Sequence, residues 1–152
     1  MASSISASSK AALEIMAIRI LLVDDHPIVR QGLKTLLAGH PGWEVIGEAS
    51  DGMEAVDKAE SLRPDVMVLD VTMPRMNGLE ACRLIRQKTP GMEILFVTQH
   101  DSPQMMREAL EAGARGYVVK SNAARDLLEA VEAVSQHRVF TALNRRDSVN
   151  SC

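Results

Sequence analysis

The chain has 152 residues, 46% hydrophobic and 24% charged, which is typical of one globular domain with a hydrophobic core. Its net charge of −3 provides no broad attraction for nucleic acid or anionic lipid, and aromatic residues, at 3%, are too few for base-stacking surfaces. No apolar run is long enough to cross a bilayer, and two cysteines are too few for a disulfide framework. We therefore expect a cytoplasmic protein without membrane contact.

From residue 18 onward, the sequence alternates between two kinds of periodicity. Five short runs of apolar and β-branched residues have the length of strands, and they span residues 18–23, 45–49, 66–69, 94–97 and 117–119. After each run, apolar residues recur every three or four positions, which is typical of an amphipathic helix. This order predicts an α/β fold in which helices cover both faces of a parallel sheet.

Local signals support these elements. Pro27 suits the first position of a helix, and Asp51 and Ser102 suit N-caps. The first, third and fourth strands are nearly all apolar, as central parallel strands should be. The segment WEVIGEA, residues 43–49, is more mixed and predicts an edge strand.

Polar side chains stand where the predicted strands end. Asp24 and Asp25 follow the first strand, and Asp70 follows the third. Thr98 ends the fourth strand and Lys120 the fifth. Taken singly, each is more often a helix cap, a strand former or a solvated charge. Because parallel strands end at one sheet edge, where such sheets bind ligands, we expect the five side chains to converge on one site.

The chemistry of this group points to a metal ion and a phosphoryl group. Three clustered carboxylates repel one another unless a cation neutralises them, and one lysine supplies too little charge. A divalent ion with oxygen ligands, together with lysine, can hold the oxygens of a phosphoryl group. Neither G-x-x-x-x-G-K-[ST] nor G-x-G-x-x-G occurs, which argues against a nucleotide, whereas a carboxylate can itself become an aspartyl phosphate.

Four stretches carry a resemblance to a known family, namely LLVDDHPIVRQGL, RPDVMVLDVTMPRMNGLEACRLIR, VTQHD and GARGYVVKS. They resemble the receiver domain of two-component response regulators, and DDHP and GARGYVVK resemble the NarL/FixJ (LuxR-like) subgroup. The resemblance covers residues 18–138 and implies a (βα)5 doubly wound, flavodoxin-like sheet with strand order 2-1-3-4-5. Residues 1–17 would then be a flexible N-terminal extension, and residues 139–152 a linker or tail without an output domain.

The resemblance also implies roles for the residues at the strand ends. Asp70 would accept the phosphoryl group. Asp25 would bind Mg²⁺, or Mn²⁺ in its place, directly, and Asp24 would hold it largely through water. Asp70 and the backbone carbonyl of Thr72 would complete the protein ligands, while Lys120 would pair with a phosphoryl oxygen.

A switch is implied as well. Thr98 would donate its hydroxyl to the phosphoryl group, and Tyr117 would turn inward as Thr98 moves. The face made by residues 102–112, the fifth strand and residues 122–137 would then change shape. The alternative for Tyr117 is a half-buried ring with its hydroxyl in water.

The implied partners are a sensor histidine kinase and, on phosphorylation, a second copy of the chain. The dimer would form through the helices after the first and fifth strands or through the switch face. Regulators of this subgroup usually carry a helix-turn-helix domain, for which residues 139–152 are too short, so DNA would be contacted only through an output domain not present here. We expect a receiver excised from a transcription regulator, not an enzyme, with only self-catalysed phosphotransfer and autodephosphorylation.

Two other functions stay open. Mg²⁺-dependent phosphatases of the haloacid-dehalogenase type also form an aspartyl phosphate, but they commonly carry a second aspartate where this chain has Thr72. The other is a phosphorylation-independent interaction module, against which the presence of every signature residue argues. A zinc site using His26 and His100 ranks low because hard oxygen ligands dominate.

Four further residues receive plainer interpretations. Cys82 is expected to be a small packed residue and not a nucleophile. Trp43 begins the second strand, away from the predicted site. His40 and His137 are expected to be solvated.

Overall fold

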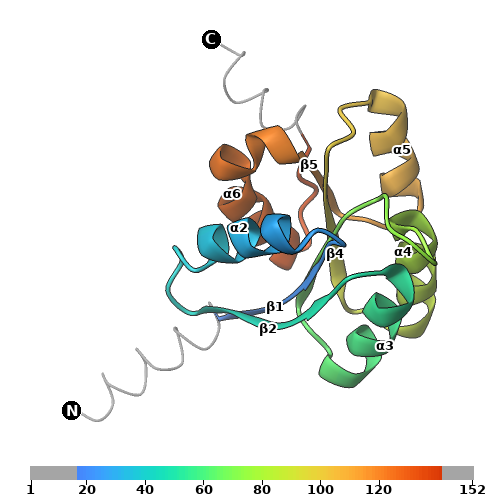
Figure 1. The fold of residues 1–152 in the computed structure, drawn as a ribbon, viewed down its shortest axis with the longest axis horizontal. Helices are drawn as coiled ribbons and strands as arrows, with labels where there is room; N and C mark the ends of the chain where they lie inside the picture. The colour runs from blue at the N-terminus through green and yellow to red at the C-terminus, as the bar shows by residue number, and fades with distance from the viewer. Residues whose placement is uncertain (1–16, 142–152) are drawn as a thin grey trace.

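A computed structural model of the chain describes residues 17–141. Five parallel strands form one sheet in the order β2-β1-β3-β4-β5, as predicted (Figure 1). The strands are β1 Ile18–Val23, β2 Trp43–Ala49, β3 Val66–Leu69, β4 Glu93–Thr98 and β5 Gly116–Val119. The helices are α2 Pro27–Leu37, α3 Gly52–Leu62, α4 Gly78–Lys88, α5 Pro103–Glu111 and α6 Ala123–Ser135, with the 3-10 turn η1 Lys120–Asn122 before α6. Most of the predicted N-terminal extension and C-terminal tail lies outside the described residues.

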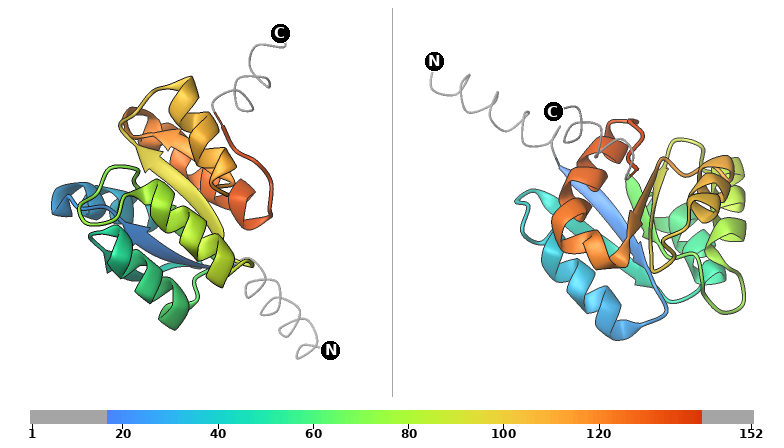
Figure 2. Two further views of the ribbon diagram at one scale, coloured as in Figure 1. Left: turned by 90° about the vertical axis from the view of Figure 1, so that its right-hand side faces the viewer. Right: turned by 90° about the horizontal axis from the view of Figure 1, so that it is seen from above.

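Helices cover both faces of the sheet, with α2 and α6 on one side and α3, α4 and α5 on the other (Figures 1 and 2). The strands divide their side chains between two cores. Leu21 and Val23 of β1 join the core under α3, α4 and α5, while Ile20 and Leu22 join the core under α2 and α6. All four are at most 1% exposed, because both faces of β1 are covered at these positions, whereas Arg19 near its start is exposed.

The predicted helix starts are confirmed. Pro27 is the first residue of α2. The Asp51 carboxylate accepts the Glu54 N–H at 2.8 Å, and the Ser102 hydroxyl accepts the Met105 N–H at 3.2 Å. None of the helices within residues 17–141 is long and apolar enough to cross a membrane.

The two edges of the sheet differ. β2 forms one edge, as its mixed composition predicts, and most of its residues are partly exposed. At the other edge the chain returns after α6, and Phe140 forms a parallel bridge with Gly116 of β5. Phe140 is 5% exposed, so residues 139–141, where the sequence predicts the start of a tail, lie against the sheet.

Candidate functional site

The carboxyl edge of the sheet carries an acidic cluster. Asp24 and Asp25 follow β1 directly, and Asp70 follows β3. Because β1 and β3 are paired neighbours, the residues after them lie side by side, and the Asp70 N–H donates to the Val23 carbonyl at 3.1 Å. One ligand atom from each aspartate and one from His26 all lie within 4.8 Å of one another.

The three aspartates differ in their surroundings. Asp24 is 1% exposed and Asp70 is 4% exposed, whereas the Asp25 side chain is 28% exposed. Asp70 Oδ1 is buried and accepts no hydrogen bond from any residue within 17–141. Leaving a buried carboxylate oxygen unpaired is costly, so this atom marks a place for a cation or a reacting ligand. The carboxylate oxygens of the cluster are the donors that Mg²⁺ prefers.

Lys120 closes the cluster from the far side. It is the first residue of η1, directly after β5, and its Nζ lies 2.8 Å from Asp24 Oδ2 and 3.0 Å from Asp70 Oδ2. Burial disfavours the charged ammonium, but the two carboxylates outweigh that effect and raise the pKa of Lys120 above its usual value. The ammonium therefore stays charged and fixes one oxygen of each aspartate.

The start of α4 packs tightly over Asp70. The Gly78 N–H donates to the Val71 carbonyl at 2.7 Å. A Cβ on Gly78 would lie 2.1 Å from the Asp70 carbonyl oxygen and 2.9 Å from Cε1 of Phe96. Only glycine lets α4 approach the backbone that carries Asp70 this closely.

Thr98 and Tyr117 meet at the backbone of His100. Thr98 is fully buried, and its Oγ1 accepts a long hydrogen bond of 3.5 Å from the His100 N–H. Tyr117 is 4% exposed, and its hydroxyl donates to the His100 carbonyl at 2.5 Å. The Tyr117 ring is therefore turned inward. The alternative prediction, a half-buried ring with its hydroxyl in water, is wrong for this conformation. Burial, helped by the charges of Asp101 and Asp70, raises the pKa of Tyr117 to about 12.

His100 is a site residue whose contacts the sequence did not predict. Its ring Nε2 lies 2.8 Å from Thr72 Oγ1, so it joins the loop after β4 to the loop after β3. The two residues are 28 positions apart, and no local pattern signals the pair. Because His100 is engaged there, His26 is the only histidine that the described part of the chain brings into the acidic cluster, where its Nδ1 lies 3.1 Å from Asp25 Oδ1. A histidine pair suited to zinc is not formed within residues 17–141.

Arg30 of α2 also supports the site without a sequence signal. Its guanidinium donates to the Asp24 carbonyl at 2.5 Å and to the Glu48 carboxylate at 3.1 Å. These contacts hold the end of β1 against both α2 and β2.

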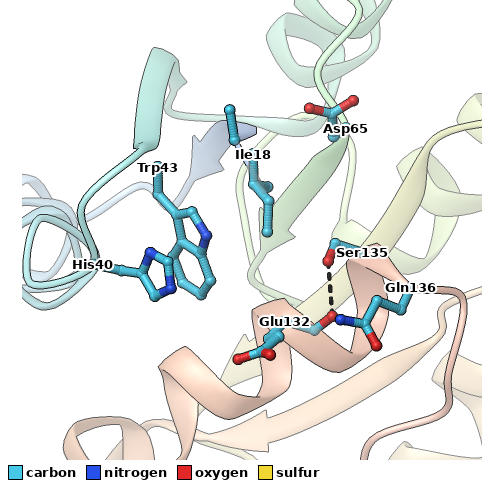
Figure 3. Close-up of a pocket in the computed structure, with 8 residues that line it drawn as sticks. Ile18, His40, Trp43, Asp65, Glu132, Ser135 and Gln136 are labelled. Atoms are coloured by element: carbon cyan, nitrogen blue, oxygen red, sulfur yellow. Dashed lines mark hydrogen bonds between the residues drawn. The ribbon is translucent and has the colours of Figure 1, made fainter. Parts of the chain in front are cut away.

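A cavity of about 300 Å³ lies at the opposite edge of the sheet, where the strands begin (Figure 3). Its lining includes Ile18, Trp43 and Asp65 at the strand starts and Glu132 near the end of α6. No residue of the predicted site lines it, so Trp43 lies away from that site, as predicted. His40 is partly exposed and stacks on Trp43 with ring centroids 4.0 Å apart, so it is not simply solvated.

The predictions for Cys82 and His137 have different outcomes. Cys82 is fully buried in α4, and burial raises the pKa of its thiol to about 12, so it is a packed residue and not a nucleophile. His137 has a 65% exposed side chain, but its Nδ1 contacts the buried carboxylate of Glu93. It is therefore not simply solvated.

Comparisons with known proteins agree on one family. The sequence profile of the response regulator receiver domain matches residues 20–132. The DNA-binding transcriptional activator DevR/DosR of Mycobacterium tuberculosis is 42% identical over 121 residues, covering 80% of this chain and 56% of that protein. The transcriptional regulatory protein DegU of Brevibacillus brevis is 40% identical over 119 residues, covering 78% and 50% respectively. The crystal structure of a LuxR-family two-component response regulator from Aurantimonas sp. has a TM-score of 0.81 at 39% identity, covering 89% of this chain and 96% of that one.

A flavodoxin-like sheet with an acidic cluster and a lysine at its carboxyl edge defines the class of receiver-type signalling domains. The chain belongs to the response regulator receiver domain family of two-component systems. Its curated relatives include transcription regulators, and similar solved structures include the LuxR-family regulator and the receiver domain of the putative response regulator NarL of Mycobacterium tuberculosis, in agreement with the NarL/FixJ subgroup. The chain spans about half the length of the curated relatives that it matches.

Proposed function

We propose that Asp70 is the phosphoacceptor of this receiver domain and that its phosphorylation switches the face formed by α5, β5 and α6. The main support for this proposal is the different environment of the two oxygens of the Asp70 carboxylate. Lys120 holds Oδ2 at 3.0 Å, whereas Oδ1 is buried without a partner among the described residues. One oxygen is thus positioned, and the other is available as a nucleophile.

The transfer itself needs few protein groups. Asp70 Oδ1 forms a bond to phosphorus while the bond from phosphorus to the donor breaks, and the electron pair leaves with the donor, a kinase histidine or a carboxylate. Lys120 is positioned to pair with a phosphoryl oxygen. Thr98 would donate its hydroxyl to another oxygen, giving up the long bond from the His100 amide. Movement of Thr98 would then favour the inward position of Tyr117.

Asp24, Asp25 and Asp70, with the backbone carbonyl of Thr72, would hold Mg²⁺, or Mn²⁺ in its place. The fit rests on the carboxylate-rich donor set and on Asp25 Oδ1, which is buried without a hydrogen-bond partner among the described residues. When bound, the ion supplies positive charge against the negative charge of the phosphoryl group. The protein groups fix where that charge is placed.

Mass spectrometry with a phosphodonor tests the assignment. Acetyl phosphate with Mg²⁺ should add one phosphoryl group to the wild-type chain and none to Asp70→Asn, because the substitution removes the carboxylate whose Oδ2 is held by Lys120 and whose Oδ1 is proposed to attack phosphorus. Asp57→Asn is the matched control, since Asp57 is an exposed aspartate on α3 and should be labelled like the wild type. EDTA should abolish the labelling. Equal labelling of Asp70→Asn and the wild type, or full labelling in EDTA, would overturn the assignment.

The phosphatase alternative is weaker in this geometry. The position two residues after Asp70 is Thr72, whose hydroxyl is engaged with His100 and supplies no carboxylic acid. We therefore propose a signalling role without turnover of external esters. Steady hydrolysis of p-nitrophenyl phosphate at enzyme-like rates, lost in Asp70→Asn, would favour the phosphatase.

The partners follow from the family and are part of the proposal. They are a sensor histidine kinase, a second copy of the chain on phosphorylation, and DNA only through an output domain of a longer protein. Relatives about twice as long that are transcription regulators support this role. We propose a cytoplasmic location and a receiver domain over residues 18–138, flanked by an extension and a linker or tail.

A further inference from the structure

The segment after α6 forms a short strap along the edge of β5. We call residues 138–141 the strap. His137 adopts a left-handed backbone conformation with φ 63°, and the Arg138 N–H donates back to the Ala133 carbonyl at 2.9 Å, so the chain reverses at the end of α6. The strap then runs parallel to the start of β5, where Phe140 bridges Gly116.

Two backbone hydrogen bonds join the strap to β5 on either side of Gly116. The Phe140 N–H donates to the Arg115 carbonyl at 3.1 Å, and the Tyr117 N–H donates to the Phe140 carbonyl at 2.9 Å. The peptide that carries Tyr117 is therefore paired with the strap on its outer side and with β4 on its inner side. This pairing limits the backbone rotation that would re-aim the tyrosine ring.

The fit of the strap depends on Gly116 and on the Phe140 side chain. A Cβ on Gly116 would lie 2.8 Å from Cδ1 of Leu95, 2.9 Å from Cγ2 of Val134 and 3.2 Å from the Phe140 carbonyl oxygen. Phe140 is 5% exposed and belongs to the core under α2 and α6, on the opposite face of the sheet from Tyr117. The Phe140 side chain and the Tyr117 ring are thus connected through the backbone hydrogen bonds between the strap and β5, and not through side-chain contact.

An ionic cluster fixes the ends of this arrangement. Glu93, the first residue of β4, is 3% exposed, and its carboxylate is bound by the side chains of Arg86, Arg115 and His137. His137 immediately precedes the strap, and Arg115 supplies the carbonyl that accepts the Phe140 N–H. The strap is therefore tied to β4, the strand that ends in Thr98.

We propose that the strap positions Tyr117, holding its ring inward with the hydroxyl on the His100 carbonyl, so that strap docking and the phosphoryl state of Asp70 favour each other. The second half of this inference rests on the proposed function of Asp70; the first half does not. Coupling between two sites is reciprocal. If a phosphoryl group on Asp70 stabilises the docked strap by a given factor, then undocking the strap must weaken the binding of the phosphoryl group by the same factor. Typical couplings correspond to about 5- to 150-fold.

The chain offers a clean reporter, because Tyr117 is its single tyrosine and Trp43 its single tryptophan. Labelling with 3-fluorotyrosine gives one ¹⁹F resonance for Tyr117, and Trp43 emission checks that a variant is folded. Phe140→Ala removes the apolar anchor, and Phe140→Leu restores most of it. Val139→Ala is the matched control, since the Val139 side chain is 43% exposed on the same segment.

In the first measurement no phosphodonor is present. The Tyr117 resonance should move towards that of a solvent-exposed tyrosine in Phe140→Ala, return in Phe140→Leu and stay in place in Val139→Ala. In the second measurement, beryllofluoride with Mg²⁺ serves as the phosphoryl analogue. The affinity of the chain for beryllofluoride should fall at least about five-fold in Phe140→Ala, and in neither of the other two variants.

The proposal is overturned if the Phe140→Ala resonance matches the wild type and its beryllofluoride affinity stays within about two-fold of it. If Phe140→Ala does not fold, His137→Asn decides, because asparagine tolerates the left-handed conformation but removes the contact with Glu93. It should shift the resonance in the same direction, and an unchanged resonance rejects the strap. A wild-type chain that takes up no phosphoryl group refutes the function of Asp70, while the donor-free measurement still decides whether the strap positions Tyr117.

Discussion

At the scale of single residues, the two adjacent aspartates after β1 have different tasks. Asp24 turns inward, where its carboxylate pairs with Lys120 and accepts the His26 N–H at 2.9 Å. Asp25 is the more exposed of the two. Successive side chains at a strand end point in different directions, so one strand can present both carboxylates to one site. The occupied oxygens of Asp24 support the expectation that Asp25 is the direct metal ligand.

Gly78 provides a test at this scale. Gly78→Ala should destabilise the domain by about 1–3 kcal/mol, the usual cost of overpacking, because the new Cβ would collide with the carbonyl of Asp70. It should also slow the labelling of Asp70 by acetyl phosphate, since the backbone must move to relieve the collision. Urea unfolding and mass spectrometry measure the two effects.

The control for that substitution is Gly32→Ala on α2. A Cβ at Gly32 would meet nothing within 4 Å, so this variant should gain about 0.5–1 kcal/mol from helix propensity and keep the wild-type labelling rate. If Gly78→Ala behaved like Gly32→Ala, the close packing of α4 over Asp70 would have no functional importance.

At the scale of elements, β4 and β5 are joined at both of their ends. At the carboxyl edge, Thr98 and Tyr117 meet at His100. At the amino edge, Glu93 binds Arg115, which directly precedes β5. The two strands are thus paired along their length and held together by side-chain contacts at both ends.

Glu93 makes this unit sensitive to acid. Burial disfavours the Glu93 carboxylate, but His137, Arg86 and Arg115 outweigh that effect and lower its pKa below the usual 4.5. The unfolded chain then binds the proton more readily than the folded one. The stabilisation is present above about pH 4.5 and is lost as the pH falls through the folded-state pKa.

Glu93→Gln tests the contribution of this carboxylate. It should cost about 3 kcal/mol at neutral pH, because the guanidinium groups of Arg86 and Arg115 lose their buried carboxylate partner. The difference from the wild type should shrink as the pH falls below about 4.5, which urea unfolding at several pH values measures. Glu129→Gln, at an exposed position on α6, should show no such difference. A Glu93→Gln deficit that is independent of pH would contradict the ionic account.

At the scale of the whole molecule, the two edges of the sheet are separated by the length of the strands. The acidic cluster lies at the carboxyl edge, whereas Trp43 and the cavity beside it lie at the amino edge (Figure 3). β1 spans six residues, which places the edges roughly 17 Å apart. The candidate site and the Trp43 side chain are therefore at opposite ends of the strands.

Trp43 emission should therefore not report on the site. Addition of Mg²⁺ and then acetyl phosphate should leave Trp43 emission unchanged, because its stacking partner His40 lies at the amino edge as well. The ¹⁹F signal of Tyr117 should change under the same conditions and serves as the positive control. A saturable change in Trp43 emission with Mg²⁺ would show that the edges are coupled or that the metal binds elsewhere.

The sequence by itself determined the order of elements, the strand order through the family resemblance, and the set of side chains at the carboxyl edge. These features depend on local periodicity and on the rule that parallel strands end at a common edge. The strand ends at Asp24, Asp70 and Thr98 were therefore predictable residue by residue. The start of α2 at Pro27 and the N-cap of α5 at Ser102 were predictable for the same reason, since capping is a local property.

Only the tertiary structure decided how those side chains pair. Several of these contacts join residues that are far apart in the chain: Lys120 with Asp24 and Asp70, His100 with Thr72 and Tyr117, and Glu93 with Arg115 and His137. The docking of Phe140 on β5 belongs to the same group, because a bridge of one residue has no periodicity. Contacts of this kind depend on how the elements pack in three dimensions, and no local pattern in the sequence carries that information.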